Sequence, residues 1–127
     1  MNLTAEVEAF MDKARHALKV GAKLLDSGDF ADAAGKAYYA MFYAAQAFLK
    51  AHGVEVVKHS SVASVLGREF AKTGRLDPRY HRMLLNARRV REIADYGIFD
   101  EVNESTARST VEDGQSFIFE IERLLHE

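Results

Sequence analysis

The chain has 127 residues, 48% of them hydrophobic, which is enough for one domain with a buried core. Its formal net charge is −2, from 17 Lys and Arg against 19 Asp and Glu, which excludes the overall basic character of a nonspecific nucleic-acid binder. The absence of cysteine excludes disulfides and thiolate metal sites and fits a cytoplasmic location. The N-terminal residues show no signal-peptide pattern, and the longest apolar stretch, residues 37–45, is too short to span a membrane.

Apolar residues repeat at intervals of three and four from about Thr4 to Asp26, which predicts an amphipathic helix. Ser27 and Gly28 end this helix, and Asp29 is the expected cap of a second helix that runs to about His52. The second helix is apolar almost all round, with Tyr39 and Tyr43 one turn apart on its otherwise polar side. Such a helix is expected to be central in its bundle or to bury a second face against a partner.

Three more helices are expected in the second half of the chain. One begins at His59-Ser60-Ser61 and closes at residues 72–74, and the next begins at Asp77-Pro78 and runs to about Asp95. The last is capped within residues 103–105. No segment shows sustained two-residue alternation, so the sequence predicts an all-α fold in one domain, residues 1–127. We expect an antiparallel four-helix up-and-down bundle with an additional short helix.

Arg91 stands out in the fourth predicted helix. Projection at about 100° per residue places it between Leu84 and Ile98, inside the apolar sector, with Asp95 one turn further on at the edge of that sector. An arginine that faces a core or an interface is costly unless it is paired. The sequence therefore predicts either a structural Arg91–Asp95 pair that fixes helix packing or dimer register, or an Arg91 that contacts a ligand.

Several segments together resemble the HEPN family, a helical nucleotide-binding domain of higher eukaryotes and prokaryotes. The likeness is to its small stand-alone bacterial and archaeal members and covers most of the chain. The segments that carry it are Gly28-Asp29-Phe30, the tyrosine-rich residues 37–45, His59-Ser60, and residues 91–96, which read Arg-Glu-Ile-Ala-Asp-Tyr.

The resemblance implies a helical bundle that forms a homodimer through its motif-bearing helices. It also implies a partnership with a small nucleotidyltransferase, often as a toxin–antitoxin pair. Active HEPN toxins are metal-independent ribonucleases whose motif is an arginine followed, after four to six residues, by a histidine. This chain keeps the arginine at Arg91 but has Tyr96, Gly97 and Ile98 at the three allowed histidine positions.

Cleavage of RNA without metal needs a base, an acid and a cation near the phosphate. The candidate catalytic residues are Arg91 as the cation, Asp95 as a base or as a partner that holds Arg91, and Tyr96 as a group that stacks on or hydrogen-bonds a base. The candidate ligand-binding residues are His59, Arg88 and Tyr39.

His59 has two readings: a phosphate contact or substitute base near Arg91, or a cap that anchors its loop. Tyr38 is expected in the core, whereas Tyr39 and Tyr43 are expected at an interface. The basic group Arg82, Arg88 and Arg89 is expected to be a solvated face that matters for RNA if a dimer doubles it into a groove. The histidines show no metal-ligand spacing and the glycines no phosphate-loop spacing, so no metal site and no cofactor are expected.

Three functions follow as hypotheses. The first is a dimeric HEPN-type module that pairs with a small nucleotidyltransferase and binds RNA or nucleotide. The second is a divergent metal-independent ribonuclease toxin that acts through Arg91 with Asp95, Tyr96 or His59. The third is a nucleotide-binding regulatory domain without catalysis.

Overall fold

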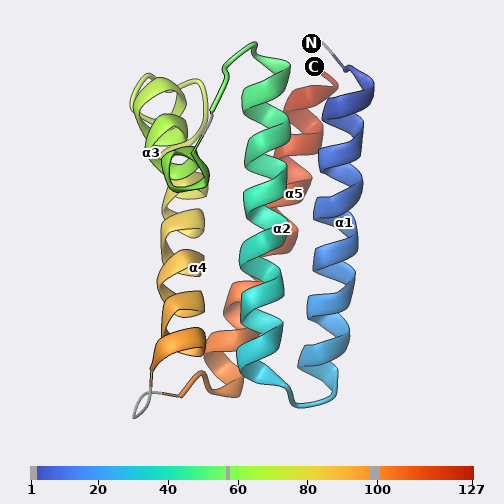
Figure 1. Ribbon diagram of the computed structural model, residues 1–127, viewed down its shortest axis with the longest axis vertical. Coiled ribbons are helices and arrows are strands. Elements are labelled where there is room, and N and C mark those ends of the chain that lie inside the picture. Colours follow the sequence, from blue (N-terminus) through green and yellow to red (C-terminus); the bar gives the residue numbers. More distant parts are fainter. Residues whose placement is uncertain (1–2, 57, 98–100) are drawn as a thin grey trace.

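The computed structural model describes residues 3–56, 58–97 and 101–127, and in these ranges it contains helices and no strand. The long helices are α1 (Ala5–Asp26), α2 (Phe30–Ala51), α4 (Pro78–Tyr96) and α5 (Glu104–Leu125). They run alternately up and down (Figure 1). A short irregular segment between α2 and α4 contains η1 (His59–Ser61), α3 (Val62–Leu66) and η2 (Gly67–Ala71). The predicted all-α bundle with an additional short helix is confirmed.

Local capping signals explain where three of the long helices begin. The hydroxyl of Thr4 accepts a hydrogen bond from the amide of Val7, and the side chain of Asn103 accepts one from the amide of Thr106. Asp77 accepts a bond from the amide of Arg79 and is followed by proline at the first helical position. These bonds satisfy amides that have no partner within the helix.

Asp29 occupies the predicted cap position of α2, but its side chain makes no capping bond. Its carboxylate accepts a hydrogen bond from the hydroxyl of Ser27. The third predicted helix is not one regular helix. Its residues form a 3₁₀ turn, one α-helical turn and a π-helical turn in succession.

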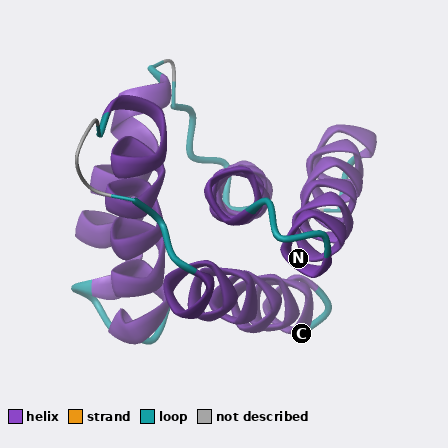
Figure 2. Ribbon diagram, turned by 90° about the horizontal axis from the view of Figure 1, so that it is seen from below, coloured by secondary structure: helices purple, strands orange, loops and turns teal. Residues whose placement is uncertain are grey.

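Helix α2 is the centre of the bundle. It packs against α1, α5 and α4, and its fourth side is left open between α1 and α4 (Figure 2). Its buried alanines, among them Ala37, Ala40 and Ala44, allow the neighbouring helices to approach closely. The prediction of a central α2 is therefore confirmed. In the described part of the chain, none of the helices combines the length and the apolarity needed to span a membrane.

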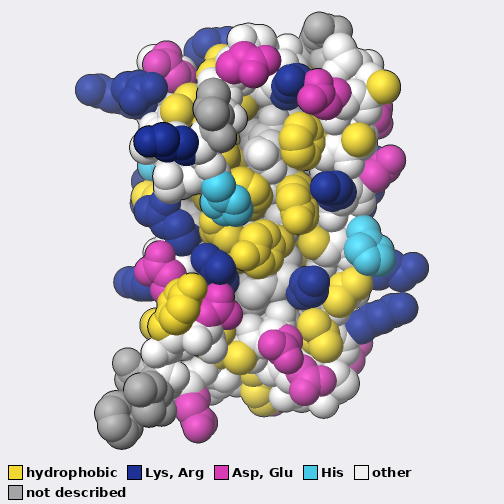
Figure 3. Space-filling model, viewed as in Figure 1, with side chains coloured by type: hydrophobic (Ala, Val, Ile, Leu, Met, Phe, Trp, Pro, Cys, Tyr) yellow, Lys and Arg dark blue, Asp and Glu magenta, His cyan; other side chains and the backbone are white. Residues whose placement is uncertain are grey.

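The open side of α2 carries half-buried aromatic residues. Tyr39 and Tyr43 lie one turn apart on it, and both pack against the core while keeping part of their surface accessible. Hydrophobic side chains form a stripe along the middle of this face, and Lys and Arg side chains lie along the edge formed by α3 and α4 (Figure 3).

Candidate functional site

A cleft of about 390 Å³ lies between α2, the η1–α3 segment and α4. Three arginines of α4 and one histidine line it together with tyrosine, phenylalanine and serine side chains, and Glu92 is its one acidic residue. These lining residues are Tyr38, Phe42, His59, Ser60, Arg88, Arg89, Arg91 and Glu92, with Ala63, Leu84 and Leu85. A hollow that combines several cations with hydroxyl groups and an aromatic surface is suited to an anion that carries a flat ring.

His59 is held against α2 by two contacts. Its ring stacks on Phe42, with centroids 3.7 Å apart and planes 16° apart. Its Nε2 atom lies 3.4 Å from the hydroxyl oxygen of Tyr38, one helical turn before Phe42. Because Tyr38 and Phe42 are buried, they give the more exposed His59 a rigid support.

Arg91 enters the same cleft from α4. Its Nε lies 2.9 Å from Oδ2 of Asp95, but its N–H is not directed at an acceptor among the described residues, so this contact is an ion pair without hydrogen-bond geometry. The guanidinium carbon lies 5.7 Å from the ring centre of Tyr38 and 5.4 Å from that of Tyr39. The side chain keeps 26% of its surface exposed, so it is held by aromatic rings on one side and remains accessible on the other.

The charges of the cleft act on its titratable groups. Burial lowers the pKa of His59, although the side chain is exposed at its outer edge, and the positive charge of Arg91 lowers it further. Burial raises the pKa of Tyr38, and the charges of Arg91 and Arg88 oppose that rise. At neutral pH the cleft therefore holds a neutral imidazole, a neutral phenol and permanently charged guanidinium groups.

The structure brings together three of the residues that the sequence singled out, because Arg91, Arg88 and His59 all line the cleft. Tyr39 lies behind them against Arg91, and Asp95 pairs with Arg91 while keeping 43% of its surface exposed. Tyr96 is 74% exposed at the end of α4 and does not line the cleft. Ile98, which was expected to flank Arg91, lies outside the described residues.

Phe42 and Ser60 were not singled out, and Tyr38 was assigned to the core alone. Tyr38 is indeed buried, yet it lines the cleft and its hydroxyl contacts His59. The four-residue spacing of Tyr38 and Phe42 places them on one side of α2, and this was the available signal. Which segment covers that side depends on packing between distant parts of the chain.

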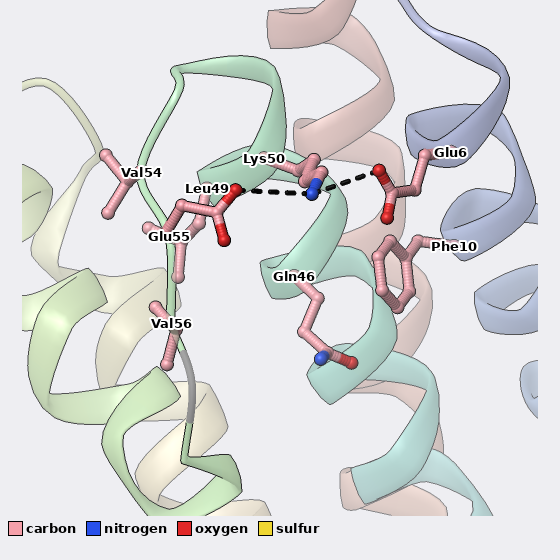
Figure 4. A pocket seen from close by; sticks show the side chains of 8 residues that line it. All are labelled: Glu6, Phe10, Gln46, Leu49, Lys50, Val54, Glu55 and Val56. Carbon is pink, nitrogen blue, oxygen red and sulfur yellow. Dashed lines mark ion pairs between the residues drawn. The ribbon is translucent and has the colours of Figure 1, made fainter.

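A second hollow, of about 200 Å³, lies near the C-terminal end of α2 beside α1, and its charged groups differ from those of the cleft. Lys50 extends between two carboxylates, with Nζ 3.0 Å from Glu6 and 3.5 Å from Glu55 (Figure 4). Phe10 and Gln46 line its floor. Because its lysine is already neutralised, this hollow lacks the available positive charge of the cleft. Within the described ranges, no group of three His, Cys, Asp or Glu side chains is arranged to hold a metal ion.

Comparison with known proteins agrees with this architecture. The HEPN domain family matches residues 7–125. A UPF0332 protein of Gloeobacter violaceus is 38% identical over 95 residues, which covers 75% of this chain and 75% of that protein. A UPF0332 protein of Thermotoga maritima is 31% identical over 125 residues, 95% of this chain and 92% of the relative. A Methanocaldococcus jannaschii protein that carries the name "Putative toxin" is 29% identical over 120 residues, 94% of this chain and 82% of the relative. The chain belongs to the HEPN domain family.

Proposed function

We propose that this chain is a dimeric HEPN module that pairs with a small nucleotidyltransferase in a toxin–antitoxin-like pair and binds the phosphate of RNA or a nucleotide in the cleft between α2 and α4. The observation that carries the binding proposal is that His59 and Arg91, 32 positions apart in the sequence, line one cleft with Arg88 and Arg89. The family and the toxin names of relatives support the pairing with a partner protein.

The cleft suits a phosphate because its cations are not fully neutralised. Arg88 and Arg89 have no ion-pair partner among the described residues, and the pair between Arg91 and Asp95 lacks hydrogen-bond geometry. A phosphate oxygen can therefore bind the outer nitrogens of Arg91 and displace Asp95. The exposed outer face of His59 can stack on a base, since its inner face is covered by Phe42.

The open side of α2 supports a homodimer. Tyr39 and Tyr43 lie half-buried on that side, next to Arg91, where the bundle provides no covering helix. Aromatic residues of this kind supply much of the binding energy of protein interfaces. A second copy on this face would also bring a second cluster of cations to the cleft.

The position and the charge state of His59 favour the ribonuclease alternative. Among the described residues that line the cleft, His59 is the only histidine, and its lowered pKa keeps the imidazole neutral at pH 7, as a general base must be. In this reaction His59 takes the proton of the 2′-hydroxyl while that oxygen bonds to phosphorus. The bond to the 5′-oxygen breaks, an acid gives that oxygen its proton, and a 2′,3′-cyclic phosphate remains. Arg91 stabilises the negative charge on the phosphate oxygens.

The test uses the purified chain, Arg91→Ala and a matched control, Arg108→Ala. Arg108 also forms an ion pair with an acidic residue four positions away, at 2.9 Å, but it lies on α5 outside the cleft. Binding of single-stranded RNA and of mononucleotides is measured by fluorescence anisotropy, and cleavage is measured in chelator. We expect Arg91→Ala to weaken binding about tenfold or more, since a charge-assisted bidentate contact is lost, and Arg108→Ala to leave it unchanged.

The outcomes separate the hypotheses. Cleavage that is lost in both Arg91→Ala and His59→Ala would establish the ribonuclease. Binding of RNA without cleavage supports the binding module, and thermal stabilisation by a mononucleotide alone supports the regulatory domain. Equal binding by the wild type and Arg91→Ala contradicts the assignment of the cleft.

A further inference from the structure

One stretch of α4 is strongly positive because it contains no acidic residue. Between Pro78 and Arg91 the sequence contains five arginines and one histidine but no Asp or Glu, although the whole chain has a net charge of −2. Arg79 lies 3.6 Å from Asp77, and Arg91 lies beside Asp95. The other three arginines of this segment have no ion-pair partner within the described ranges. Binding of an anion would reduce the electrostatic repulsion among these arginines.

A further hollow lies on the same face of α4, towards its N-terminus. It measures about 460 Å³ and is open to solvent, and its lining includes Arg68 from η2, Lys72 directly after η2, and His81 from α4. Glu69 accepts a hydrogen bond from Nε of Arg68 at 3.1 Å. Among the described residues, the terminal nitrogens of Arg68 and the ammonium group of Lys72 have no ion-pair partner, so they can contact a ligand.

The packing of His81 gives this hollow a defined wall. Its Nε2 lies 2.9 Å from the carbonyl oxygen of Ala63, and because a carbonyl only accepts, Nε2 carries the proton. The ring lies so close to Gly67 that a Cβ atom there would be 2.6 Å from it. Glycine at this position therefore lets the imidazole approach the short segment closely and form one side of the hollow.

This hollow and the cleft between α2 and α4 follow each other along one helix face. His81, Leu85 and Arg88 are spaced by four and three residues, so they share one side of α4. Arg88 lies seven positions after His81 in the helix, which is about 10 Å along the axis. That distance is too long for one phosphate group and suits the backbone of a short single strand.

We infer that this face of α4 is a track for single-stranded RNA, in which Arg68 and Lys72, beside the wall formed by His81, make a second phosphate subsite beyond the cleft. The inference rests on the proposed function, since it takes the cleft as the first subsite, and it names the ligand as an oligonucleotide longer than a dinucleotide. The stack of His59 on Phe42 at the edge of the track favours a nucleic acid over an acidic protein, because its exposed imidazole face is a platform for an unpaired base.

The experiment measures anisotropy of labelled uridine dinucleotide and of longer oligouridines, each at several salt concentrations. The test variant is Arg68→Ala with Lys72→Ala. The matched control is Lys19→Ala with Lys23→Ala, which removes the same charge from two exposed lysines of α1, on the other side of α2. Both variants are first shown to unfold at the wild-type temperature.

We expect affinity to rise with length and then level off. The Arg68/Lys72 variant should bind the long oligomers about tenfold more weakly, bind the dinucleotide as the wild type does, and lose about 0.7 of the logarithmic salt slope for each lost phosphate contact. The Lys19/Lys23 control should bind both the long oligomers and the dinucleotide with the affinity of the wild type. The track is wrong if affinity does not increase with the length of the oligomer, or if the Arg68/Lys72 and Lys19/Lys23 variants lose the same affinity for long oligomers.

The dependence on Arg91 separates this inference from the proposed function. If binding requires Arg91 but does not increase with length, the cleft is correct and the second subsite is wrong. If long oligomers require Arg68 and Lys72 but not Arg91, the second subsite stands and the proposed cleft is wrong. If no oligomer binds, both are wrong.

Discussion

The hydroxyl oxygen of Tyr38 lies 3.4 Å from Nε2 of His59, and this contact joins a buried residue of the central helix to an exposed one 21 positions later. The ring of Phe42 stacks on the same imidazole. The position of His59 is therefore determined by α2, whereas α4 contributes the cations that face it. The candidate chemistry of the cleft depends on both helices being in place.

The pKa of His59 should respond to Arg91. Burial lowers this pKa first and the charge of Arg91 lowers it further, so Arg91→Gln should raise it while leaving it below its usual range. The measurement is an NMR titration of the imidazole protons, assigned with His59→Asn. Arg108→Gln serves as the control and should leave the titration unchanged. An identical His59 titration in Arg91→Gln would show that the two side chains do not interact.

Acidification should destabilise the protein through its two histidines with lowered pKa values. Burial and the charge of Arg75 lower the pKa of His52, and burial and Arg91 lower that of His59. As the pH falls below about 6.5, these histidines gain protons in the unfolded chain before they do so in the folded one. The free energy of unfolding therefore decreases as the pH decreases, until the pH is below the lowered pKa values of the folded state. Urea unfolding at neutral and mildly acidic pH measures this slope.

His52→Leu should remove part of that slope. The guanidinium of Arg75 donates to Nδ1 of His52 at 3.1 Å, while Nε2 is buried without a partner among the described residues. The ring packs between Phe48 and Phe70, at 4.5 and 4.9 Å. Protonation would remove the acceptor and bring two cations together. If the variant keeps the full slope, His52 does not contribute to it.

Asp95→Asn should strengthen phosphate binding. Asp95 competes with a ligand for Arg91, so its neutralisation should lower the dissociation constant for RNA a few-fold at low salt. The free energy of unfolding should change by less than about 1 kcal/mol, since Asp95 is exposed and its pair with Arg91 lacks hydrogen-bond geometry. Anisotropy and urea unfolding measure the two effects. Loss of cleavage with intact binding would instead make Asp95 the base.

Tyr43→Glu should convert the expected homodimer into a monomer. Tyr43 lies on the open side of α2, where a carboxylate would be buried by a second copy. Sedimentation at micromolar concentration measures the mass. Phe119→Glu is the matched control, because Phe119 is 72% exposed on α5 and lies away from the proposed dimer face. A wild type that is monomeric at this concentration, or equal effects of both substitutions, contradicts the proposed dimer.

Two glycine substitutions should have opposite effects on stability. A Cβ at Gly67 would lie 2.6 Å from the imidazole of His81, so Gly67→Ala should displace that ring, break its bond to Ala63 and cost about 1 kcal/mol. Gly35, within α2, has no atom within 4 Å of its added Cβ, so Gly35→Ala should gain about 0.5–1 kcal/mol from helix propensity. Urea unfolding of both variants checks the signs. An unchanged free energy of unfolding in Gly67→Ala would mean that His81 moves without a cost in stability.

Much of this protein could be predicted from residues close together in the sequence. The caps at Thr4 and Asn103, the Asp77-Pro78 start and the apolar repeat of the long helices gave the bundle, because capping and amphipathic periodicity act within a turn or two. The pairing of Arg91 with Asp95 followed from the same short-range geometry.

Contacts between distant segments decided the rest. The π-helical turn of η2 faces α4, where His81 packs on Gly67, and no local pattern indicates it. His59 contacts Tyr38 and shares the cleft with Arg91 only because the segment after α2 folds back over that helix. Such contacts depend on how whole helices pack, which involves side chains many turns apart. The sequence alone therefore determined the long helices and named three residues of the cleft, His59, Arg88 and Arg91, while the tertiary structure decided that they share it.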